Sequence, residues 1–269
     1  MPELPEVETI KNELLPHVLG RTIKSVDIYW DKMVRKPSVQ EFRARVIDQK
    51  ITGISRRGKY LFFHLSGGEV LVMHMKMTGS LLVNPLDGKF TRAVLHLDKG
   101  VDLHFRDPRK FGVMWLDKDE SVVAGKLGPE PLDDDFTPET LAGILRHRTT
   151  PVKPVILDQS IIAGIGNMYA DEALFEARIH PLKPAGSLSW VEIKRLYNAI
   201  RLVLQKALRK KGASVRNYIR PDGEPGTAHD EFSVAHGVGK NCPKCGGAIQ
   251  RIVVRGRGTY ICPKCQREP

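Results

Sequence analysis

Apolar residues in the first twenty positions recur at spacings of three and four. One stripe of this kind predicts an amphipathic helix whose apolar face packs on a core. Pro16 lies inside the stripe and has no amide hydrogen to donate, so the pattern predicts that the regular helix ends near Leu15, with Gly20 closing the element. The stripe consists of Val7, Ile10, Leu14 and Val18.

Short runs with β-strand character follow one another up to about residue 105. Turn residues such as Ser66-Gly67-Gly68 and Asp98-Lys99-Gly100 punctuate many of them, as hairpin connections require. Several strands with little helix between them predict a sandwich or a barrel. The predicted strands are Ser25–Trp30, Ile51–Ser55, Tyr60–Leu65, Glu69–Met75, Ala93–Leu97 and Val101–Phe105.

The pattern becomes helical after about Gly128. Thr137-Pro138 predicts a helix start with proline at the first position. The clearest helix is predicted over Ser189–Lys211, where Ser189 and Glu192 form a capping box and Gly212 follows the last basic turn. Residues 213–237 are rich in Gly, Pro and Asp and predict a long mobile loop. The expected fold class is α+β, with a β-rich half, a helical half and a cysteine-containing module.

The charge balance restricts the partner. Lys plus Arg exceed Asp plus Glu by 42 − 31, a net charge of +11, and the pI is about 9.5. This excess favours a polyanion, because cations placed on phosphates release condensed counterions; DNA, ribosomal RNA and an anionic membrane would all attract it. No apolar run approaches the ~20 residues of a membrane helix, and the acidic, proline-rich start is unlike a signal peptide. We therefore expect a cytoplasmic protein.

All four cysteines lie near the end of the chain, in two C-x-x-C pairs. Cys242 and Cys245 form one pair and Cys262 and Cys265 the other, with sixteen residues between the pairs. Four thiolates at this spacing can close a tetrahedron around Zn²⁺ with no open position, which indicates a structural rather than catalytic zinc. The segment between them reads as strand, turn and strand. Such a hairpin with one cysteine pair at each end resembles a zinc ribbon.

Two arginines flank a glycine at the predicted hairpin tip. Arg255 and Arg257 are either solvated side chains on a turn or a clamp for phosphate oxygens, which the guanidinium fork fits well. The N-terminus raises a comparable choice. Removal of Met1 would leave Pro2 with a secondary amine that is partly neutral near its pKa of ~8 and can attack carbon electrophiles. Glu3 could then move protons, or Pro2-Glu3-Leu4-Pro5-Glu6 could be only a rigid helix start.

Several motifs along the chain, in the same order, resemble the formamidopyrimidine-DNA glycosylase family. Matched motifs in order are more specific than any single one. They are Met1–Thr9, Arg57-Gly58-Lys59-Tyr60-Leu61, His74–Ser80, Asp107–Gly112, Leu127–Pro131, Gly164–Tyr169 and the four cysteines.

The resemblance implies a three-part fold. Residues 1–130 would form an N-terminal β-sandwich with the leading helix, and residues 131–237 a helical domain with a helix–two-turn–helix element and a base-reading loop at 213–237. Residues 238–269 would form a four-cysteine zinc finger with a β-hairpin. The implied enzyme is a monomeric, bacterial, nucleoid-associated DNA glycosylase and AP lyase. Its substrates would be duplex DNA with oxidised purines (8-oxoguanine or formamidopyrimidines) or abasic sites.

The family's catalytic roles carry over to four residues. Pro2 would attack the deoxyribose C1′, and Glu3 would protonate the opening sugar. Lys59 would donate a proton and contact phosphate, although Arg56-Arg57-Gly58-Lys59 could also be an ordinary basic turn. Arg257 would bind phosphate and assist δ-elimination.

The family's DNA contacts carry over to a second set of residues. Met77, Arg109 and Phe111 would fill the gap left when the damaged base leaves the helix, as a flexible thioether, an aromatic ring and a pairing guanidinium can. The other implied DNA-binding residues are His74, Lys153, Asn167 and Arg257. Read singly, Met77 and Phe111 would more often be core residues, and His74 a structural histidine.

The sequence departs from the family pattern at three places. Phe90-Thr91-Arg92 replaces a His-rich segment, Thr149 replaces a basic position, and Ala235-His236-Gly237-Val238 replaces a Tyr-Gly-Arg-like run. Two other functions remain as alternatives. The first is an endonuclease VIII-like enzyme for oxidised pyrimidines, which typically has Gly where this chain has Leu4. The second is a non-catalytic zinc-ribbon protein, which would not need the Pro2–Glu3–Lys59 combination.

Overall fold

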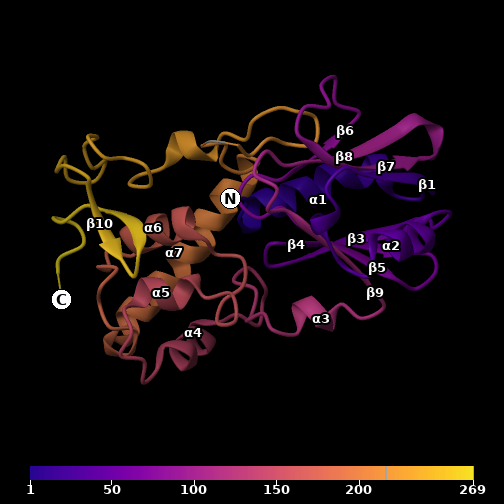
Figure 1. Cartoon of the computed structure of the whole chain (residues 1–269). Helices are drawn as coiled ribbons and strands as arrows, with labels where there is room; N and C mark the ends of the chain where they lie inside the picture. Colours follow the sequence, from indigo (N-terminus) through magenta and orange to yellow (C-terminus); the bar gives the residue numbers. More distant parts are fainter. Residues whose placement is uncertain (216, 269) are drawn as a thin grey trace. The chain divides into compact units, whose positions relative to one another are not determined.

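The computed structural model describes residues 1–215 and 217–268. Its contacts divide the chain into two compact units, each interrupted in sequence (Figure 1). Unit 1 comprises Met1–Lys126 and Lys210–His229, and unit 2 comprises Leu127–Arg209 and Asp230–Pro269. The mixed α+β class predicted from the sequence is confirmed. None of the helices in the described part of the chain is long and apolar enough to cross a membrane.

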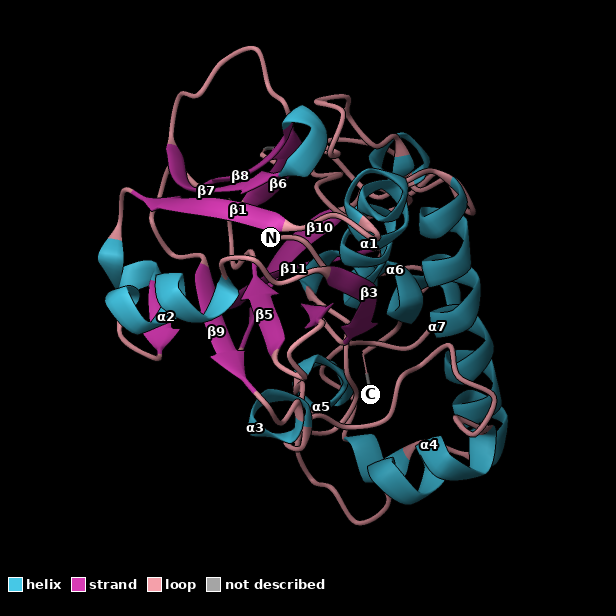
Figure 2. Cartoon of the chain, turned by 90° about the vertical axis from the view of Figure 1, so that its right-hand side faces the viewer, coloured by secondary structure: helices cyan, strands magenta, loops and turns pink. Residues whose placement is uncertain are grey.

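Unit 1 contains two separate β-sheets, which confirms a sandwich rather than a barrel (Figure 2). All neighbouring strands are antiparallel except β2 and β9, which run parallel. Each of the six predicted strands is present. One sheet has the order β1 (Ile23–Ile28), β7 (Thr91–Leu97), β8 (Val101–Arg106), β6 (Ser80–Val83), and the other β2 (Val34–Lys36), β9 (Val113–Asp117), β5 (Val70–His74), β4 (Tyr60–Leu65), β3 (Ile51–Arg57).

Helix α1 (Leu4–Val18) contributes its apolar stripe to the core of unit 1. All four stripe residues are fully buried among side chains from both sheets. The helix continues through Pro16 to Val18, so the predicted end near Leu15 is wrong. The proline is tolerated because the last turn still closes after it: the amide of Leu19, the C-cap residue, donates to the Leu15 carbonyl at 3.0 Å.

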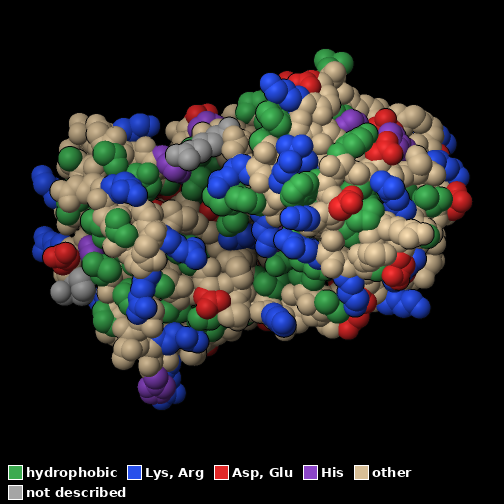
Figure 3. Space-filling model, viewed as in Figure 1, with side chains coloured by type: hydrophobic (Ala, Val, Ile, Leu, Met, Phe, Trp, Pro, Cys, Tyr) green, Lys and Arg blue, Asp and Glu red, His purple; other side chains and the backbone are tan. Residues whose placement is uncertain are grey.

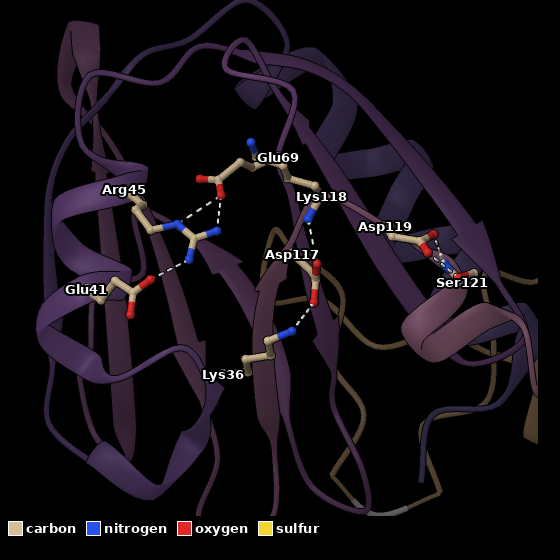
Figure 4. A network of polar contacts seen from close by, with 8 residues as sticks. All are labelled: Lys36, Glu41, Arg45, Glu69, Asp117, Lys118, Asp119 and Ser121. Atoms are coloured by element: carbon tan, nitrogen blue, oxygen red, sulfur yellow. Dashed lines mark hydrogen bonds and ion pairs between the residues drawn. The ribbon is translucent and has the colours of Figure 1, made fainter.

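The sequence pattern missed several short elements of unit 1. These are η1 (Asp31–Met33), α2 (Val39–Val46), η2 (Asp98–Gly100), α3 (Ser121–Ala124) and strands β2, β6 and β9. Ion pairs fasten two of them (Figure 4). Arg45 on α2 binds both Glu41 and Glu69, and Lys36 on β2 lies 2.7 Å from Asp117 on β9. Such contacts join residues up to 81 positions apart, beyond the reach of a local pattern.

Unit 2 is helical, with a two-stranded hairpin near its C-terminal end. The predicted capping residues are confirmed: Thr137 Oγ1 accepts from the Thr140 amide, and Ser189 and Glu192 bond reciprocally at the start of α7. Glu172 on α6 accepts from the amides of residues 233–235 at 2.8–2.9 Å, which fixes the chain before the cysteine module. The elements are α4 (Pro138–Leu145), α5 (Val152–Leu157), α6 (Asn167–Glu176), η3 (Ala185–Ser187), α7 (Trp190–Arg209), β10 (Gln250–Val254) and β11 (Arg257–Ile261), while η4 (Ala228–Glu231) spans the last boundary between the units.

Candidate functional site

The start of α1 holds the first two candidate catalytic residues in unit 1. Pro2 is buried, and Glu3 is the N-cap residue of the helix and 2% exposed. The Glu3 amide donates to Glu6 Oε2 at 2.7 Å. This bond is part of a capping box, which the Glu-x-x-Glu spacing allows. The backbone beside Pro2 is therefore fixed in position.

Glu6 also binds a segment far away in sequence. Its Oε1 accepts from the Ala213 amide at 2.8 Å, so one carboxylate joins the N-terminus to segment 210–229 of unit 1. The side chain is fully buried. Sequence reasoning missed this role of Glu6. No local pattern indicates a partner 207 positions away.

Lys59 lies in the two-residue turn between β3 and β4. Gly58 precedes it with a φ of +56°, a left-handed conformation that glycine adopts without steric cost. Arg56 connects this turn to α1, since its Nε lies 2.8 Å from Glu8 Oε2 and its Nη1 donates to the Gly58 carbonyl at 2.9 Å. The structure thus links the hairpin that carries Lys59 to the helix that carries Pro2 and Glu3. Lys59 is only 5% exposed.

His74, at the end of β5, is held as a neutral ring. Burial, followed by the positive charges of Lys76 and Lys59, lowers the pKa of His74 to about 3. Its Nδ1 accepts from the Lys76 amide at 2.8 Å, and Tyr60 packs edge-on with ring centroids 4.4 Å apart. The proton therefore resides on Nε2, where it is available as a neutral hydrogen-bond donor.

The three residues predicted to fill the helix gap lie together in unit 1. Arg109 Cζ is 4.5 Å from the centroid of the Phe111 ring, and Arg109 Nη1 is 3.6 Å from the Met77 sulfur. Met77 is 47% exposed and Phe111 44%, so neither is the core residue that each would be if read singly. An exposed thioether, guanidinium and aromatic ring in contact can enter a base stack as one body.

Asp107 holds the loop that carries Arg109 and Phe111. Its fully buried carboxylate accepts from the amides of Phe111 and Gly112 at 2.7 Å and of Arg109 at 3.1 Å, and it also binds the Thr78 hydroxyl. Sequence reasoning did not single out Asp107. Its place at the head of Asp107-Pro108-Arg109-Lys110 is typical of an Asx-type turn and could have indicated this role.

In unit 2, Lys153 makes an internal ion pair. Its Nζ lies 2.7 Å from Asp171 Oδ1 and 2.7 Å from the Thr259 hydroxyl, and the side chain is 1% exposed. Asp171 Oδ2 also accepts from the Tyr260 amide at 3.1 Å. Burial raises the pKa of Asp171 to about 7, against the opposing effect of Lys153. The predicted DNA contact of Lys153 stays a prediction. The buried ion pair favours an indirect contribution of Lys153 to DNA binding, through the position of the hairpin.

Asn167 begins α6 and reaches the same hairpin. Its Nδ2 donates to the Gly258 carbonyl at 3.0 Å, while Lys153 Nζ approaches that carbonyl at 3.3 Å. The first residue of β11, Arg257, is exposed and immediately precedes this anchored carbonyl. Arg255 and Gly256 form the turn with positive φ values of 49° and 76°, as a tight two-residue hairpin requires. Arg255 and Arg257 line a cavity of about 510 Å³ together with Thr150 and Gln159.

The four cysteines form a metal site. Their sulfurs all lie within 4.8 Å of one another, with Cys242–Cys265 at 3.8 Å and Cys245–Cys262 at 3.4 Å. Tetrahedral Zn–S bonds of ~2.3 Å place sulfurs about 3.8 Å apart, so the donor set fits one structural zinc. Phe175, Val234 and Ile249 pack around the buried Cys242 and Cys262, which excludes water from that side.

Comparison with known proteins agrees with this architecture. The formamidopyrimidine-DNA glycosylase N-terminal domain matches residues 1–114, its H2TH domain residues 127–218, and the zinc finger found in FPG and IleRS residues 239–267. Curated formamidopyrimidine-DNA glycosylases from Roseiflexus sp. and Chloroflexus aurantiacus are 45% and 46% identical. Each alignment covers 99% of this chain and 100% or 98% of the relative.

Solved structures give the same result. The crystal structure of MutM (Fpg) from Thermus thermophilus is 40% identical, with a TM-score of 0.91 and full coverage of both chains. A complex of Lactococcus lactis Fpg with abasic-site DNA is 36% identical, with a TM-score of 0.92, covering 99% of this chain and all of that one. Two β-sheets, a helical unit and a four-cysteine zinc finger together define a protein of the DNA-glycosylase type. The chain belongs to the formamidopyrimidine-DNA glycosylase family.

Proposed function

We propose that this chain is a bifunctional DNA glycosylase and AP lyase that removes oxidised purines, 8-oxoguanine and formamidopyrimidines, and then cuts the strand. The observation that carries the proposal is the link made by Arg56, which joins the helix of Pro2 and Glu3 to the hairpin of Lys59. The family membership and the Lactococcus lactis complexes with Fapy-dG and abasic-site DNA support formamidopyrimidines and abasic sites as substrates. A non-catalytic zinc-ribbon protein would not need the hairpin of Lys59 to be joined to the helix of Pro2 and Glu3.

The proposed chemistry begins at the secondary amine of Pro2, once Met1 has been removed. The amine attacks the deoxyribose C1′, the bond from C1′ to the base breaks, and the base leaves with a proton. Glu3 protonates the ring oxygen as the sugar opens, which gives an iminium between Pro2 and C1′. The iminium withdraws electrons, so loss of a C2′ proton expels the 3′ phosphate, and a second elimination expels the 5′ phosphate. Water then releases the sugar remnant and restores the amine.

The remaining residues bind DNA in this proposal, and Lys59 and Arg257 also take part in the chemistry. Met77, Arg109 and Phe111 fill the gap left by the extruded nucleotide, and Arg109 pairs with the orphaned base. Lys59 donates a proton and contacts phosphate, and the Nε2–H of His74 binds phosphate. In unit 2, Asn167 and Arg257 bind phosphate, Lys153 supports them through the hairpin, and Arg257 also assists δ-elimination.

The surface charge supports a polyanionic partner. On the face drawn in Figure 3, Lys and Arg side chains are more abundant than Asp and Glu, in keeping with the net charge of +11. Such a surface attracts the DNA backbone at long range and raises the rate of encounter, while the residues named above supply the specific contacts.

The proposed division of labour follows the three domains predicted from the sequence. Residues 1–130 supply the nucleophile, residues 131–237 bind the backbone and read the base through 213–237, and residues 238–269 supply Arg257. We further propose that the protein acts as a monomer in the bacterial cytoplasm beside the nucleoid, where its DNA substrate is.

Borohydride trapping tests the proposal directly. Duplex DNA with one 8-oxoguanine opposite cytosine is incubated with the full-length protein and borohydride, which reduces an iminium to a stable amine. We expect a covalent adduct, with mass spectrometry placing the bond on Pro2. Pro2→Gly is expected to abolish excision while leaving binding of damaged DNA largely intact. Pro5→Gly makes the same change three residues further on and should still form the adduct.

The other outcomes separate the alternatives. Undiminished excision by Pro2→Gly would show that the nucleophile is wrongly assigned. An adduct with an oxidised pyrimidine but not with 8-oxoguanine would favour the endonuclease VIII-like activity. No adduct with either lesion, in protein shown to lack Met1, would favour the zinc-ribbon DNA-binding protein.

A further inference from the structure

A cavity lies in unit 2 at the C-terminal end of α6, next to the cysteine module. Its walls come mainly from residues 178–183, which follow α6, and from residues 264–268, around the last cysteine. The volume is about 520 Å³. Because a water molecule occupies only ~30 Å³, a cavity of this size has room for a ligand with several functional groups.

One buried side chain fixes the two walls against each other. Gln266 is 1% exposed, its Nε2 donates to the Ile179 carbonyl at 2.9 Å, and its Oε1 accepts from the Cys262 amide at 3.1 Å. The wall that follows α6 is also tied to α7, since Lys183 Nζ lies 2.7 Å from Glu192 Oε1. The cavity is therefore shaped before any ligand binds, so less conformational entropy is lost on binding.

Positive charge predominates in the lining of this cavity. Five Lys or Arg side chains and two carboxylates line it. Two of the lysines already form ion pairs with glutamates, and Lys264 packs beside the Cys245 sulfur, where it offsets the negative charge of the zinc-binding thiolates. Within residues 1–215 and 217–268, Arg178 and Arg267 have no ion pair and no side-chain hydrogen bond. These two guanidinium groups are available to an anionic ligand.

A buried histidine adds a neutral hydrogen-bond donor. His180 is 4% exposed, and its Nδ1 accepts from the Leu182 amide at 3.3 Å. Burial lowers the pKa of His180, against the opposing effect of Glu268, so the ring is neutral at physiological pH and carries its proton on Nε2. His180 lines the cavity, and its Nε2 has no hydrogen-bond partner among the residues that the structure describes. An acceptor on a ligand would satisfy this donor.

Arg178 occupies a backbone position that favours glycine. It follows the C-cap residue of α6 with a φ of +56°, the left-handed conformation in which helices commonly end. Glycine adopts this conformation without steric cost, whereas an arginine is strained there. Strained residues that persist are concentrated at functional sites, and the side chain of Arg178 lines the cavity.

The location and the lining of the cavity argue against DNA as its ligand. Asn167 begins α6, and the cavity lies at the other end of this ten-residue helix, about 15 Å away. Among the described residues that line the cavity, none is Phe, Tyr or Trp, so it offers no large aromatic ring on which a base could stack. Its two carboxylates, those of Glu192 and Glu268, would repel a chain of phosphates but can accept from the amides of a peptide.

We propose that this cavity binds an acidic segment of a partner protein. Arg178 and Arg267 hold carboxylates of the segment, and the Nε2–H of His180 donates to a further acceptor. A guanidinium group binds a carboxylate through two parallel hydrogen bonds, which add geometric specificity to the attraction of charge. Clustered arginines are a recurrent means of recognising acidic motifs. The site goes beyond the proposed glycosylase activity and does not depend on it, and it leaves the DNA-binding residues free while a partner is bound.

The test uses a short fluorescein-labelled oligoglutamate peptide and the zinc-loaded, full-length protein. Fluorescence anisotropy measures its affinity, and the same peptide with glutamine at every position removes the charge. We expect the glutamate peptide to bind more tightly, and Arg178→Gly and Arg267→Gln each to weaken its binding by about tenfold, the loss expected for a charged hydrogen bond. Because the whole chain is basic, Arg209→Gln, on an exposed residue of α7 outside the cavity, is the matched control and should bind like wild type.

Arg178→Gly separates lost recognition from lost folding. Glycine relieves the strain at this position, so the melting temperature should not fall although the affinity for the peptide does. His147→Gly makes the same backbone change at another exposed residue, with a φ of +61°, and should leave the affinity unchanged. In NMR spectra, the glutamate peptide should shift the ring resonances of His180 and not those of His147.

Several outcomes would overturn the proposal. One is equal affinity of wild type, Arg178→Gly and Arg267→Gln for the glutamate peptide, and another is equal affinity of wild type for the glutamate and glutamine peptides. Weaker binding of abasic-site DNA by the two variants would assign the cavity to the DNA-binding surface instead. Both variants should form the borohydride adduct as wild type does. A wild-type protein that binds the peptide through these arginines but forms no adduct would reject the proposed activity and keep the peptide site.

Discussion

The Lys153 ammonium and the Asp171 carboxylate lie 2.7 Å apart, and both side chains are excluded from solvent. Lys153 follows the start of α5, Asp171 lies on α6, and both also bond to β11, the strand that begins at Arg257. A buried ion pair is a poor source of net stability, since desolvation offsets most of the attraction. Its effect is instead to fix the hairpin against the two helices.

Removing one partner of this pair should be costly. Lys153→Met leaves Asp171 buried without its counter-charge, so we expect the free energy of unfolding to fall by about 3–5 kcal/mol. The double variant Lys153→Met/Asp171→Leu removes both charges and should be at least as stable as either single variant. Chemical denaturation measures all three. Losses that simply add in the double variant would contradict the pairing.

His74 should remain neutral across the physiological range. Its pKa of about 3 lies below the ordinary 6.5, so the unfolded chain takes up a proton before the folded one does as the pH falls. The stability contributed by neutral His74 is therefore complete above pH 6.5 and is lost between pH 6.5 and about 3, by at most about 1.4 kcal/mol per pH unit.

NMR titration of the imidazole protons checks this. We expect no titration of His74 between about pH 5 and 8. His96 is the internal control, because burial opposes its charged form but bonds to Asp102 and Asp27 outweigh burial and raise its pKa. A His74 resonance that titrates near the ordinary histidine value would show that the ring is not held as described.

Asp107→Asn should loosen the loop of Arg109 and Phe111. An amide cannot accept from all three amides and the Thr78 hydroxyl with the strength of a carboxylate, so we expect a loss of about 2–4 kcal/mol of stability. Affinity for abasic-site DNA should fall as well, because the two side chains are no longer held together. Asp87→Asn, in an exposed turn, serves as the control. Unchanged DNA affinity in stable Asp107→Asn protein would show that the carboxylate does not position the loop.

Metal analysis should find one zinc per chain. Cys262→Ser removes a fully buried thiolate, so zinc content should drop and the hairpin should lose its anchor at the cysteine end. Binding to abasic-site DNA should weaken with it, and a chelator should produce the same loss in wild-type protein. Full zinc content in the Cys262→Ser protein would place the metal elsewhere.

Gly226→Ala should displace segment 210–229. A Cβ at position 226 would lie 2.2 Å from the Lys211 carbonyl oxygen and 2.4 Å from that of Gly212, and backbone atoms cannot yield cheaply. We expect a loss of about 1–3 kcal/mol of stability. Gly143→Ala, inside α4 with open space around it, should instead be neutral or slightly stabilising. Equal effects of the two substitutions would argue against the close packing of this segment.

Local patterns predicted much of the fold. The six strands and the caps at Thr137 and Ser189 are confirmed because each depends on a few neighbouring residues. The cysteine spacing predicted the zinc site for the same reason. Pro16 misled the prediction of the end of α1, since the effect of a proline depends on how many turns follow it. Strands β2 and β9 were missed because they depend on pairing with distant strands.

The candidate site was predictable only in part. The resemblance named Met77, Arg109 and Phe111, and the structure adds that they touch. The resemblance did not supply the buried carboxylates that hold the site. Asp107 binds amides of its own loop, which an Asx-type turn could have indicated, but Glu6 and Asp171 bind distant backbone amides. The partners of Glu6 and Asp171 are 207 and 89 positions away. Such roles are set by tertiary structure and leave little trace in local sequence.

The interrupted course of unit 1 has a consequence for synthesis on the ribosome. Tyr218 belongs to the core of the N-terminal unit, and the Ala213 amide completes the bonds of Glu6 beside Pro2. The nascent chain therefore cannot complete the folding of unit 1 when residue 126 emerges from the ribosome. It has to wait for the segment that ends at His229, after most of unit 2 has left the exit tunnel. The proposed nucleophile is the second residue of the sequence, yet its surroundings are among the last to be assembled.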